Sequence, residues 1–238
     1  MSQLNNHIKG SFIALAWPET QVVKEGKWYD TVTEFMGFIK NGKYTVGHAA
    51  LALVNHETGK VSYYDFGRYH TPFQTGRVRG EITDPELKIH TNAKIQNSEI
   101  TNISAILDCI EQNPSNHGDG IMFASVTNNI NFSAAETKAI QMQNQGIIDY
   151  SPLNNGSTNC SRFVSQVAKS SNIKTLQKIA LTIPYTFTPS PRSNIRIIGN
   201  EKCYYTAQNG QVNRYQKTNQ SLFNMFQTKV NALQLSQI

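Results

Sequence analysis

Hydrophobic runs separated by turn-forming residues divide the first third of the chain into strands. The apolar run at residues 11–17 predicts a buried strand, and Pro18 ends it. A second run at residues 44–54 and its return at residues 60–69 flank a tetrad that contains glycine. Two strand-like segments around such a turn predict an antiparallel hairpin.

Helical spacing of apolar residues dominates the later part of the chain. Residues 101–112 and 133–144 are predicted to be helices, the second starting with a capping box formed by Ser133 and Glu136. The other expected elements are a strand over 120–126, loops over 70–93, strands over 179–187, 195–198 and 202–206, a rigid turn at 188–192, and helices over 30–38 and 220–235. This order predicts an α+β fold with a central antiparallel sheet, or a half-barrel, surrounded by helices.

Composition limits the domain count and the kind of partner. With 238 residues, of which 39% are hydrophobic, the chain is long enough for one sizeable domain. We expect that domain over residues 1–200, with residues 201–238 forming a C-terminal extension packed on it. Lysine plus arginine exceed the acidic residues by 22 − 16 = 6. Because no basic run concentrates this surplus, we expect no nucleic-acid partner.

Cysteine usage and the absence of long apolar stretches indicate the compartment. Three cysteines, with no Cys-x-x-Cys pair, favour neither a disulfide framework nor a zinc site. Neither a signal peptide nor a run of 18 apolar residues is evident, so we expect no transmembrane segment. The expected location is the cytoplasm, with export as an effector left open. The oligomeric state is also open.

Cys160 lies where a polar loop becomes a helix. Residues 150–159 are polar and contain a glycine, and the apolar residues after Cys160 recur at helical spacing, namely Phe163, Val164, Val167 and Ala168. The free N–H groups and the dipole at a helix start favour a thiolate over a thiol. Cys160 is therefore the candidate nucleophile, whereas Cys109 and Cys203 are interpreted as packed small side chains.

Among six histidines, His48 is the best candidate partner for Cys160. It lies in residues 45–54, where small apolar neighbours predict a strand buried on both faces, so its ring needs a polar partner. Gly47 and Ala49 leave room for a helix terminus. The alternative is a core histidine bonded to a backbone carbonyl. Other histidines in predicted loops stay open as partners, namely His70, His90 and His117.

These motifs resemble a known superfamily. A Gly-His strand, its hairpin partner and a later Asn-Cys-x-x-Phe-Val at a helix start are similar to the circularly permuted NlpC-like, papain-fold cysteine hydrolases, which include relatives of lecithin:retinol acyltransferase and the YiiX-like proteins. His48 precedes Cys160 by 160 − 48 = 112 residues, which is the permuted order. Longer phrases between residues 11 and 195 resemble a family of uncharacterised bacterial proteins.

The resemblance implies a reaction and roles for named residues. Cys160 would be the nucleophile, His48 the general base, and the Cys160 backbone N–H one oxyanion donor. The reaction would pass through a thioester and need no metal or organic cofactor. Amide bonds in peptides or peptidoglycan fragments are the expected substrates, followed by acyl esters or thioesters of lipids.

Two other classes of function compete with this one. The fold could be retained as a catalytically inactive binding or effector module, with the arginines between Arg68 and Arg79 forming a recognition surface. A metal site built from His48, Cys160 and Asp65 is the third possibility.

A third catalytic residue should come from the strand paired with the histidine strand. The turn places the residue opposite His48 at about 66–68, so Asp65 is the best polar candidate. Its alternative role is a salt bridge to Arg68 or Arg77. The expected substrate-binding residues are Trp17, Glu19, Tyr29, Tyr150 and Asn159; the first three belong to a loop that walls the active site in permuted relatives.

Overall fold

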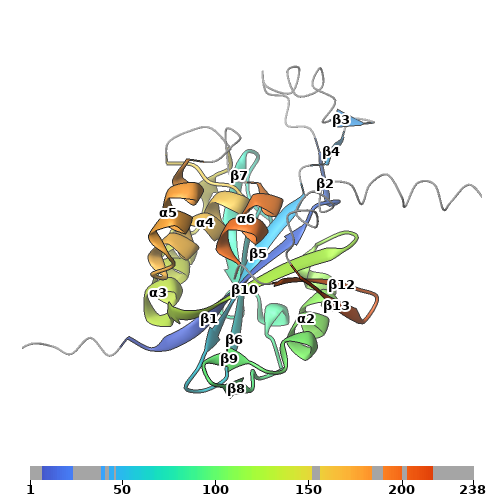
Figure 1. The fold of residues 1–238 in the computed structure, drawn as a ribbon. Coiled ribbons are helices and arrows are strands. Elements are labelled where there is room, and N and C mark those ends of the chain that lie inside the picture. The colour runs from blue at the N-terminus through green and yellow to red at the C-terminus, as the bar shows by residue number, and fades with distance from the viewer. Residues whose placement is uncertain are drawn as a thin grey trace, which may run out of the picture.

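The computed structural model describes residues 7–23, 39–40, 43–45, 47–151, 156–183, 190–199 and 203–216 (Figure 1). Its centre is an eight-stranded antiparallel sheet with the order β11-β7-β6-β5-β1-β10-β12-β13. The strands are β1 (Lys9–Trp17), β5 (His48–Asn55), β6 (Val61–Gly67), β7 (Thr75–Gly80), β10 (Met122–Asn131), β11 (Ile148–Asp149), β12 (Cys203–Gln208) and β13 (Gln211–Gln216). The predicted α+β class with a central antiparallel sheet is confirmed.

Helices cover both faces of the sheet (Figure 1). One face carries α3 (Phe132–Asn144), α4 (Cys160–Ser170), α5 (Thr175–Thr182) and α6 (Pro191–Ile198). The other carries α2 (Ile103–Glu111), the 3₁₀ turns Pro85–Leu87 and Pro114–Asn116, and the small hairpin of β8 (Ile95–Gln96) and β9 (Glu99–Ile100). A separate three-stranded sheet contains β2 (Gln21–Val23), β3 (Ile39–Lys40) and β4 (Lys43–Thr45).

The central strands separate two hydrophobic cores. Along β1, Phe12 and Ala14 pack into the core under α3, α4 and α6, whereas Ile13 and Leu15 pack into the core under α2. Alternate side chains of a strand point to opposite faces, so both faces of β1 must be apolar. This explains why the first strand reads as a continuous hydrophobic run rather than as an alternating one.

The β5–β6 hairpin is confirmed, and its turn uses local hydrogen bonds. The Asn55 side chain accepts from the backbone N–H groups of Glu57 and Thr58. Val54 lies opposite Val61, and Ala50 lies opposite Asp65. Side chains of both strands that share a face with His48 are thereby fixed in register.

The loop predicted over residues 70–93 is wrong in part, because β7 lies within it. This strand contains two glycines and two arginines and so lacks an apolar pattern. A Cβ at Gly76 would come within 2.7 Å of the Phe66 ring, and one at Gly80 within 2.8 Å of the Tyr64 ring. The aromatic rings of β6 therefore occupy the space that side chains of β7 would fill.

Two short strands predicted near the C-terminal end are also wrong. Residues 179–182 belong to α5, residues 184–187 of that predicted strand lie outside the described residues, and residues 195–198 belong to α6. Ser190 caps α6 through a hydrogen bond from the Ser193 N–H, and Pro191 is its first residue. These start signals outweigh the strand preference of the isoleucines. In α3, Asn131 caps the helix instead of Ser133.

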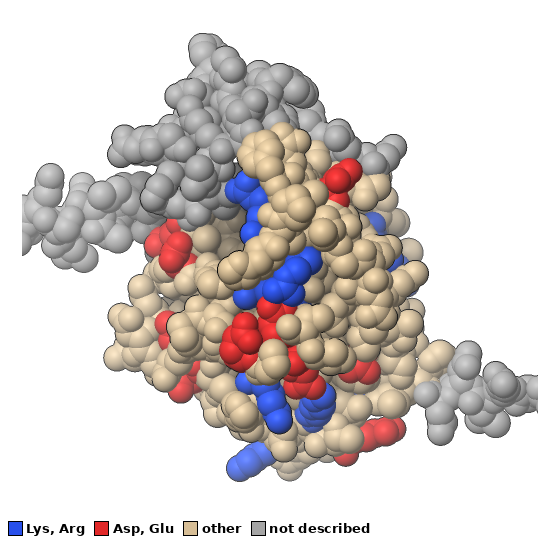
Figure 2. Space-filling view, turned by 180° about the vertical axis from the view of Figure 1, so that it is seen from behind, with Lys and Arg blue, Asp and Glu red and all other residues tan. Residues whose placement is uncertain are grey.

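The segment beyond residue 202 continues the central sheet. β12 pairs with β10 over Met122–Ala124, and β13 pairs with β12. The helices predicted over 30–38 and 220–235 lie outside the described residues. No helix in the described ranges is long and apolar enough to cross a membrane. On the rear face, acidic and basic side chains lie side by side instead of forming one basic patch (Figure 2).

Candidate active site

Cys160 is the first residue of α4, as the sequence predicts. The Asn159 side chain accepts from the Arg162 N–H at 2.8 Å and caps the helix. α4 packs its apolar face against β5 and β6. Cys160 itself is 8% exposed. The start of the helix is therefore anchored over the sheet with the thiol turned inward.

His48 is the first residue of β5 and lies opposite Trp17. It is 8% exposed, and its ring stacks on the Trp17 indole with centroids 5.7 Å apart. The space beside Gly47 is filled by the Trp17 carbonyl, not by the helix terminus that we expected there. The helix start approaches at Ala49, the other small residue expected to leave room for it, where the backbone N–H donates to the Cys160 sulfur.

The His48 ring has polar partners on both sides. Its Nε2 atom is 3.5 Å from Asp65 Oδ2 and 3.5 Å from the Tyr69 hydroxyl. The Cys160 side chain is close enough to the ring to raise the pKa of His48 by hydrogen bonding and by charge. Because Nε2 faces the carboxylate, Nδ1 is the nitrogen available to the sulfur. His48 is thus placed between Cys160 and Asp65.

The electrostatic surroundings of Cys160 and His48 favour an ion pair between the two side chains. Burial opposes a charge on His48, but its hydrogen bonds to Asp65 and Cys160 outweigh burial and raise its pKa to about 9. Burial alone would raise the pKa of the Cys160 thiol, whereas its hydrogen bond to His48 and the imidazolium charge hold that pKa below the ordinary value. Both shifts favour the thiolate–imidazolium pair over the neutral pair.

Asp65 is fully buried and forms more contacts than the hairpin alone predicts. Arg79 donates from Nε to Oδ1 at 3.0 Å and from Nη2 to Oδ2 at 2.6 Å. The hydroxyls of Tyr63 and Tyr69 each donate to Oδ2 at 3.2 Å. Burial opposes the charge on Asp65, but the bonds to His48 and Arg79 lower its pKa. The carboxylate therefore stays ionised.

The salt bridge considered for Asp65 exists, but with a different arginine. Its partner is Arg79, whereas Arg77 binds Asp84 at 2.7 and 2.5 Å. The Arg68 guanidinium lies over the Tyr150 ring, 5.3 Å from its centroid. The two roles considered for Asp65, orienting His48 and pairing with an arginine, are combined in one carboxylate.

The residues predicted to bind substrate differ in their exposure and in the side chains that they contact. Trp17 is only 1% exposed and packs against His48, while Glu19 is exposed beside Gly120. Tyr150 stacks on Phe66 with centroids 5.8 Å apart. Asn159 is used as the helix cap. Tyr29 lies outside the described residues.

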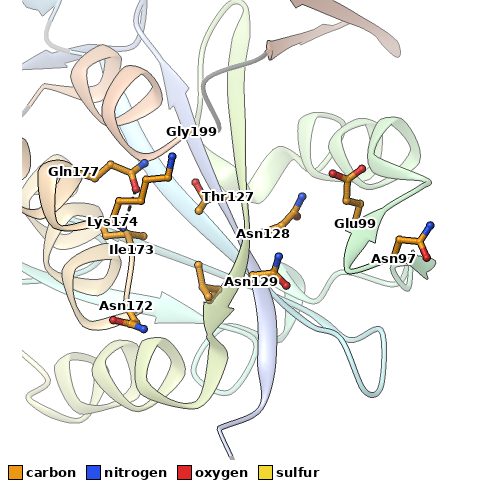
Figure 3. A pocket seen from close by; sticks show the side chains of 11 residues that line it. Asn97, Glu99, Thr127, Asn128, Asn129, Asn172, Ile173, Lys174, Gln177 and Gly199 are labelled. Carbon is orange, nitrogen blue, oxygen red and sulfur yellow. Dashed lines mark hydrogen bonds between the residues drawn. The ribbon is translucent and has the colours of Figure 1, made fainter.

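A hollow lies at the other end of α4. It has a volume of about 360 Å³ and extends across β10 between α5 and the β8–β9 hairpin (Figure 3). Asparagines dominate its lining, namely Asn97, Asn128, Asn129 and Asn172. None of the predicted site residues within the described ranges lines it, so Cys160 and His48 are separate from this hollow.

Comparison with known proteins places the chain in a family. The sequence matches the family described as type VI secretion system effector TseH-like over residues 12–176, which is more than half of the chain. The chain belongs to the TseH-like family of type VI secretion system effectors. None of the curated proteins matches its sequence.

A solved structure supports the fold of this TseH-like protein. The crystal structure of the type VI secretion system effector TseH is similar, with a TM-score of 0.57 and 17% sequence identity. The match covers 87% of this chain and 98% of that chain. At this identity the likeness concerns the fold alone.

Sequence reasoning did not connect Tyr69 or Arg79 with Asp65 in this TseH-like chain, and it left His117 open only as a partner of Cys160. Arg79 binds Asp65, donates to the Ser115 carbonyl at 2.9 Å, and places its guanidinium 3.4 Å from the Tyr69 ring centroid. Tyr69 also stacks on His117, with centroids 5.3 Å apart. The spacing of Arg77 and Arg79 two residues apart is compatible with a strand that points both side chains to one face. The glycines on either side of them obscured this strand in the sequence.

The metal hypothesis finds no support in the geometry. Within the described ranges, no group of three or more His, Cys, Asp and Glu side chains could hold a metal ion. Asp65 directs both carboxylate oxygens to hydrogen-bond donors, chiefly Arg79. A guanidinium at this position repels a cation.

Proposed function

We propose that this TseH-like protein is a cysteine hydrolase of the permuted papain-like, NlpC-like type. Cys160 is the nucleophile, His48 the general acid and base, and Asp65 the residue that orients the imidazole. The observation that supports this proposal is the buried His48 ring, which interacts with the Cys160 thiol and lies 3.5 Å from Asp65 Oδ2. This is the nucleophile–base–orienter arrangement that covalent acyl transfer requires.

The proposed reaction uses two displacements. The Cys160 thiolate attacks the carbonyl carbon, and the carbon–nitrogen bond breaks as the His48 imidazolium gives its proton to the leaving amine. A water molecule then gives a proton to His48 and attacks the thioester, which releases the acid and restores the thiolate–imidazolium pair. Backbone N–H groups at the start of α4 have no partners inside the helix and are suited to hold the oxyanion.

The substrate class we favour is an amide bond in a peptide or a peptidoglycan fragment. Membership of an effector family favours export of the protein and a target outside the producing cell. Esters or thioesters of lipids are the second substrate class, because the same dyad serves acyl transfer in relatives that the sequence resembles. An inactive binding module is the alternative of a different class.

Selective alkylation tests whether Cys160 is activated. We expect iodoacetamide to modify Cys160 at least about tenfold faster than Cys109 or Cys203 in the folded protein, measured by peptide mass spectrometry. Cys160 is the most buried of the three, so faster labelling reports thiolate character and not exposure. Equal, slow labelling of all three would contradict the proposal.

Hydrolysis assays on peptidoglycan fragments and acyl esters then assign the substrate. Cys160→Ala and His48→Ala should abolish release of product, whereas Cys109→Ala is the matched control and should retain it. Circular dichroism confirms that each variant is folded. Activity that survives Cys160→Ala would exclude the thioester route.

A further inference from the structure

The proposed catalytic pair sits in a site that must hold several charges without water. Side chains of Asp65 and Arg79 are 0% and 3% exposed, and His48 is 10% exposed. An unbalanced charge in such a place is costly, so buried charges are expected to be paired. Whether Cys160 ionises therefore depends on the sum of the charges around it.

Four groups form a continuous row in the structure. The Cys160 thiol interacts with His48, His48 faces Asp65 at 3.5 Å, and Asp65 binds Arg79. Their charges alternate as thiolate, imidazolium, carboxylate and guanidinium. The row adds up to zero only when Arg79 is included.

We propose that Arg79 is a positioning residue that balances the charge of the catalytic site, so that Cys160 can be a thiolate while Asp65 is ionised behind His48. This inference rests on the proposed function of Cys160 and His48. Without Arg79, a row of thiolate, imidazolium and carboxylate carries one negative charge in a buried place. The site then restores neutrality by keeping the proton on Cys160.

The other titratable groups facing this row are neutral at neutral pH. Burial and the charge of Asp65 raise the pKa values of Tyr63 and Tyr69 well above the ordinary value. Burial and the charge of Arg79 lower the pKa of His117, which stacks on Tyr69. They leave the sum of the four charges unchanged.

Arg79 also connects the row to the loop that contains Ser115 and Gly118. It donates to the Ser115 carbonyl, and the same loop places Gly118 against the Trp17 indole that covers His48. Arg79 therefore fixes the carboxylate in position from behind, in addition to supplying charge. The two effects can be separated, because lysine keeps the charge and methionine keeps most of the volume.

Four variants of the full chain test the proposal through the pH dependence of iodoacetamide labelling at Cys160. Arg79→Met should raise the apparent pKa of Cys160 by a unit or more and slow labelling at neutral pH by about tenfold or more. Arg79→Lys should stay within about threefold of the original protein, because a lysine keeps the positive charge. Arg77→Met is the matched control on the same strand and should label like the original protein.

The decisive variant removes both partners. In Asp65→Asn/Arg79→Met the remaining thiolate and imidazolium add up to zero, and the asparagine oxygen can still accept from His48. We expect labelling to return to within about threefold of the original protein. A purely structural role for Arg79 predicts no such rescue, and this variant also decides the matter if Arg79→Met fails to fold.

The outcomes separate the two proposals. If Cys160 of the original protein labels no faster than Cys109 and Cys203, the proposed function fails. If it labels fast and Arg79→Met does so equally, or if the double variant remains as slow as Arg79→Met, only the charge-balancing role of Arg79 is overturned.

Discussion

Two arginines on β7, only two residues apart, form ion pairs in very different surroundings. The Arg79 and Asp65 side chains are 3% and 0% exposed, whereas those of Arg77 and Asp84 are 25% and 8% exposed. Asp65 shares its carboxylate with His48, while Asp84 binds only the Thr83 hydroxyl besides Arg77 among the contacts we describe. The same chemical pair thus supports the proposed catalytic site in one place and a surface turn in the other.

The difference follows from strand pairing. β7 pairs with β6, which puts Arg79 opposite Asp65 and Arg77 opposite Gly67. Asp84 reaches Arg77 from the turn that follows the strand, where two N–H groups donate to the Gly80 carbonyl. A buried pair gains little net stability but is costly to break, whereas a partly exposed pair is screened by water.

Replacing Arg79 or Arg77 in turn should give the largest difference in the free energy of unfolding. Arg79→Met leaves Asp65 charged and buried, so we expect a loss of about 3–5 kcal/mol in the free energy of unfolding. Arg77→Met should cost about 1–2 kcal/mol, because Asp84 keeps its Thr83 bond. Urea unfolding measures both, and equal losses would break the comparison.

Unfolding at acidic pH should reveal how much Asp65 and Asp84 each contribute to stability. The pKa values of Asp65 and Asp84 are both below the ordinary value in the folded protein. A lowered pKa gives stability that is present above the unfolded value near 4 and is lost as pH falls through the folded value. Because the Asp65 side chain is 0% exposed and that of Asp84 is 8% exposed, Asp65→Asn should flatten the acid limb of stability more than Asp84→Asn does, as urea unfolding at several acidic pH values would reveal. A larger flattening from Asp84→Asn contradicts the prediction.

The fall of the hydrolysis rate at high pH should depend on the buried row of Cys160, His48, Asp65 and Arg79. It should not depend on Arg77. His48 has its pKa raised to about 9, so the imidazolium that protonates the leaving amine is lost as pH rises through that value. We expect the rate to fall about tenfold per pH unit above it. Arg77→Met should keep the same limb in a pH–rate profile, and a limb that begins near pH 6.5 would contradict the raised value.

An exposed pair should have the smallest effect. Lys60 and Glu81 form an ion pair whose side chains are 53% and 24% exposed. Lys60→Ala should change the free energy of unfolding by at most about 0.5 kcal/mol, and added salt should reduce the difference further. Thermal unfolding at low and high salt measures this difference. A loss of stability as large as that of Arg77→Met would show that burial does not determine how much each ion pair contributes.

Local sequence signals predicted the parts of the site that depend on local structure. A polar loop, an Asn-Cys pair and apolar residues at helical spacing placed Cys160 at a helix start, which α4 confirms. The turn that follows Val54 and the strand pattern around it predicted the hairpin and pointed to Asp65. The short helix α6 was missed because Ile195, Ile197 and Ile198 are β-branched, and their strand preference is weak against a Ser-Pro start and tertiary packing.

By itself, the sequence determined which segments are apolar enough to form the sheet, where the cysteine helix begins and which histidine lies in a buried strand. Only the tertiary structure decided that Arg79, and not Arg68 or Arg77, binds Asp65. That choice depends on the register of β7 against β6, which is set by aromatic rings packing over Gly76 and Gly80. A pattern of glycines and arginines carries no local signal for a strand, because its stabilising contacts come from the neighbouring strand.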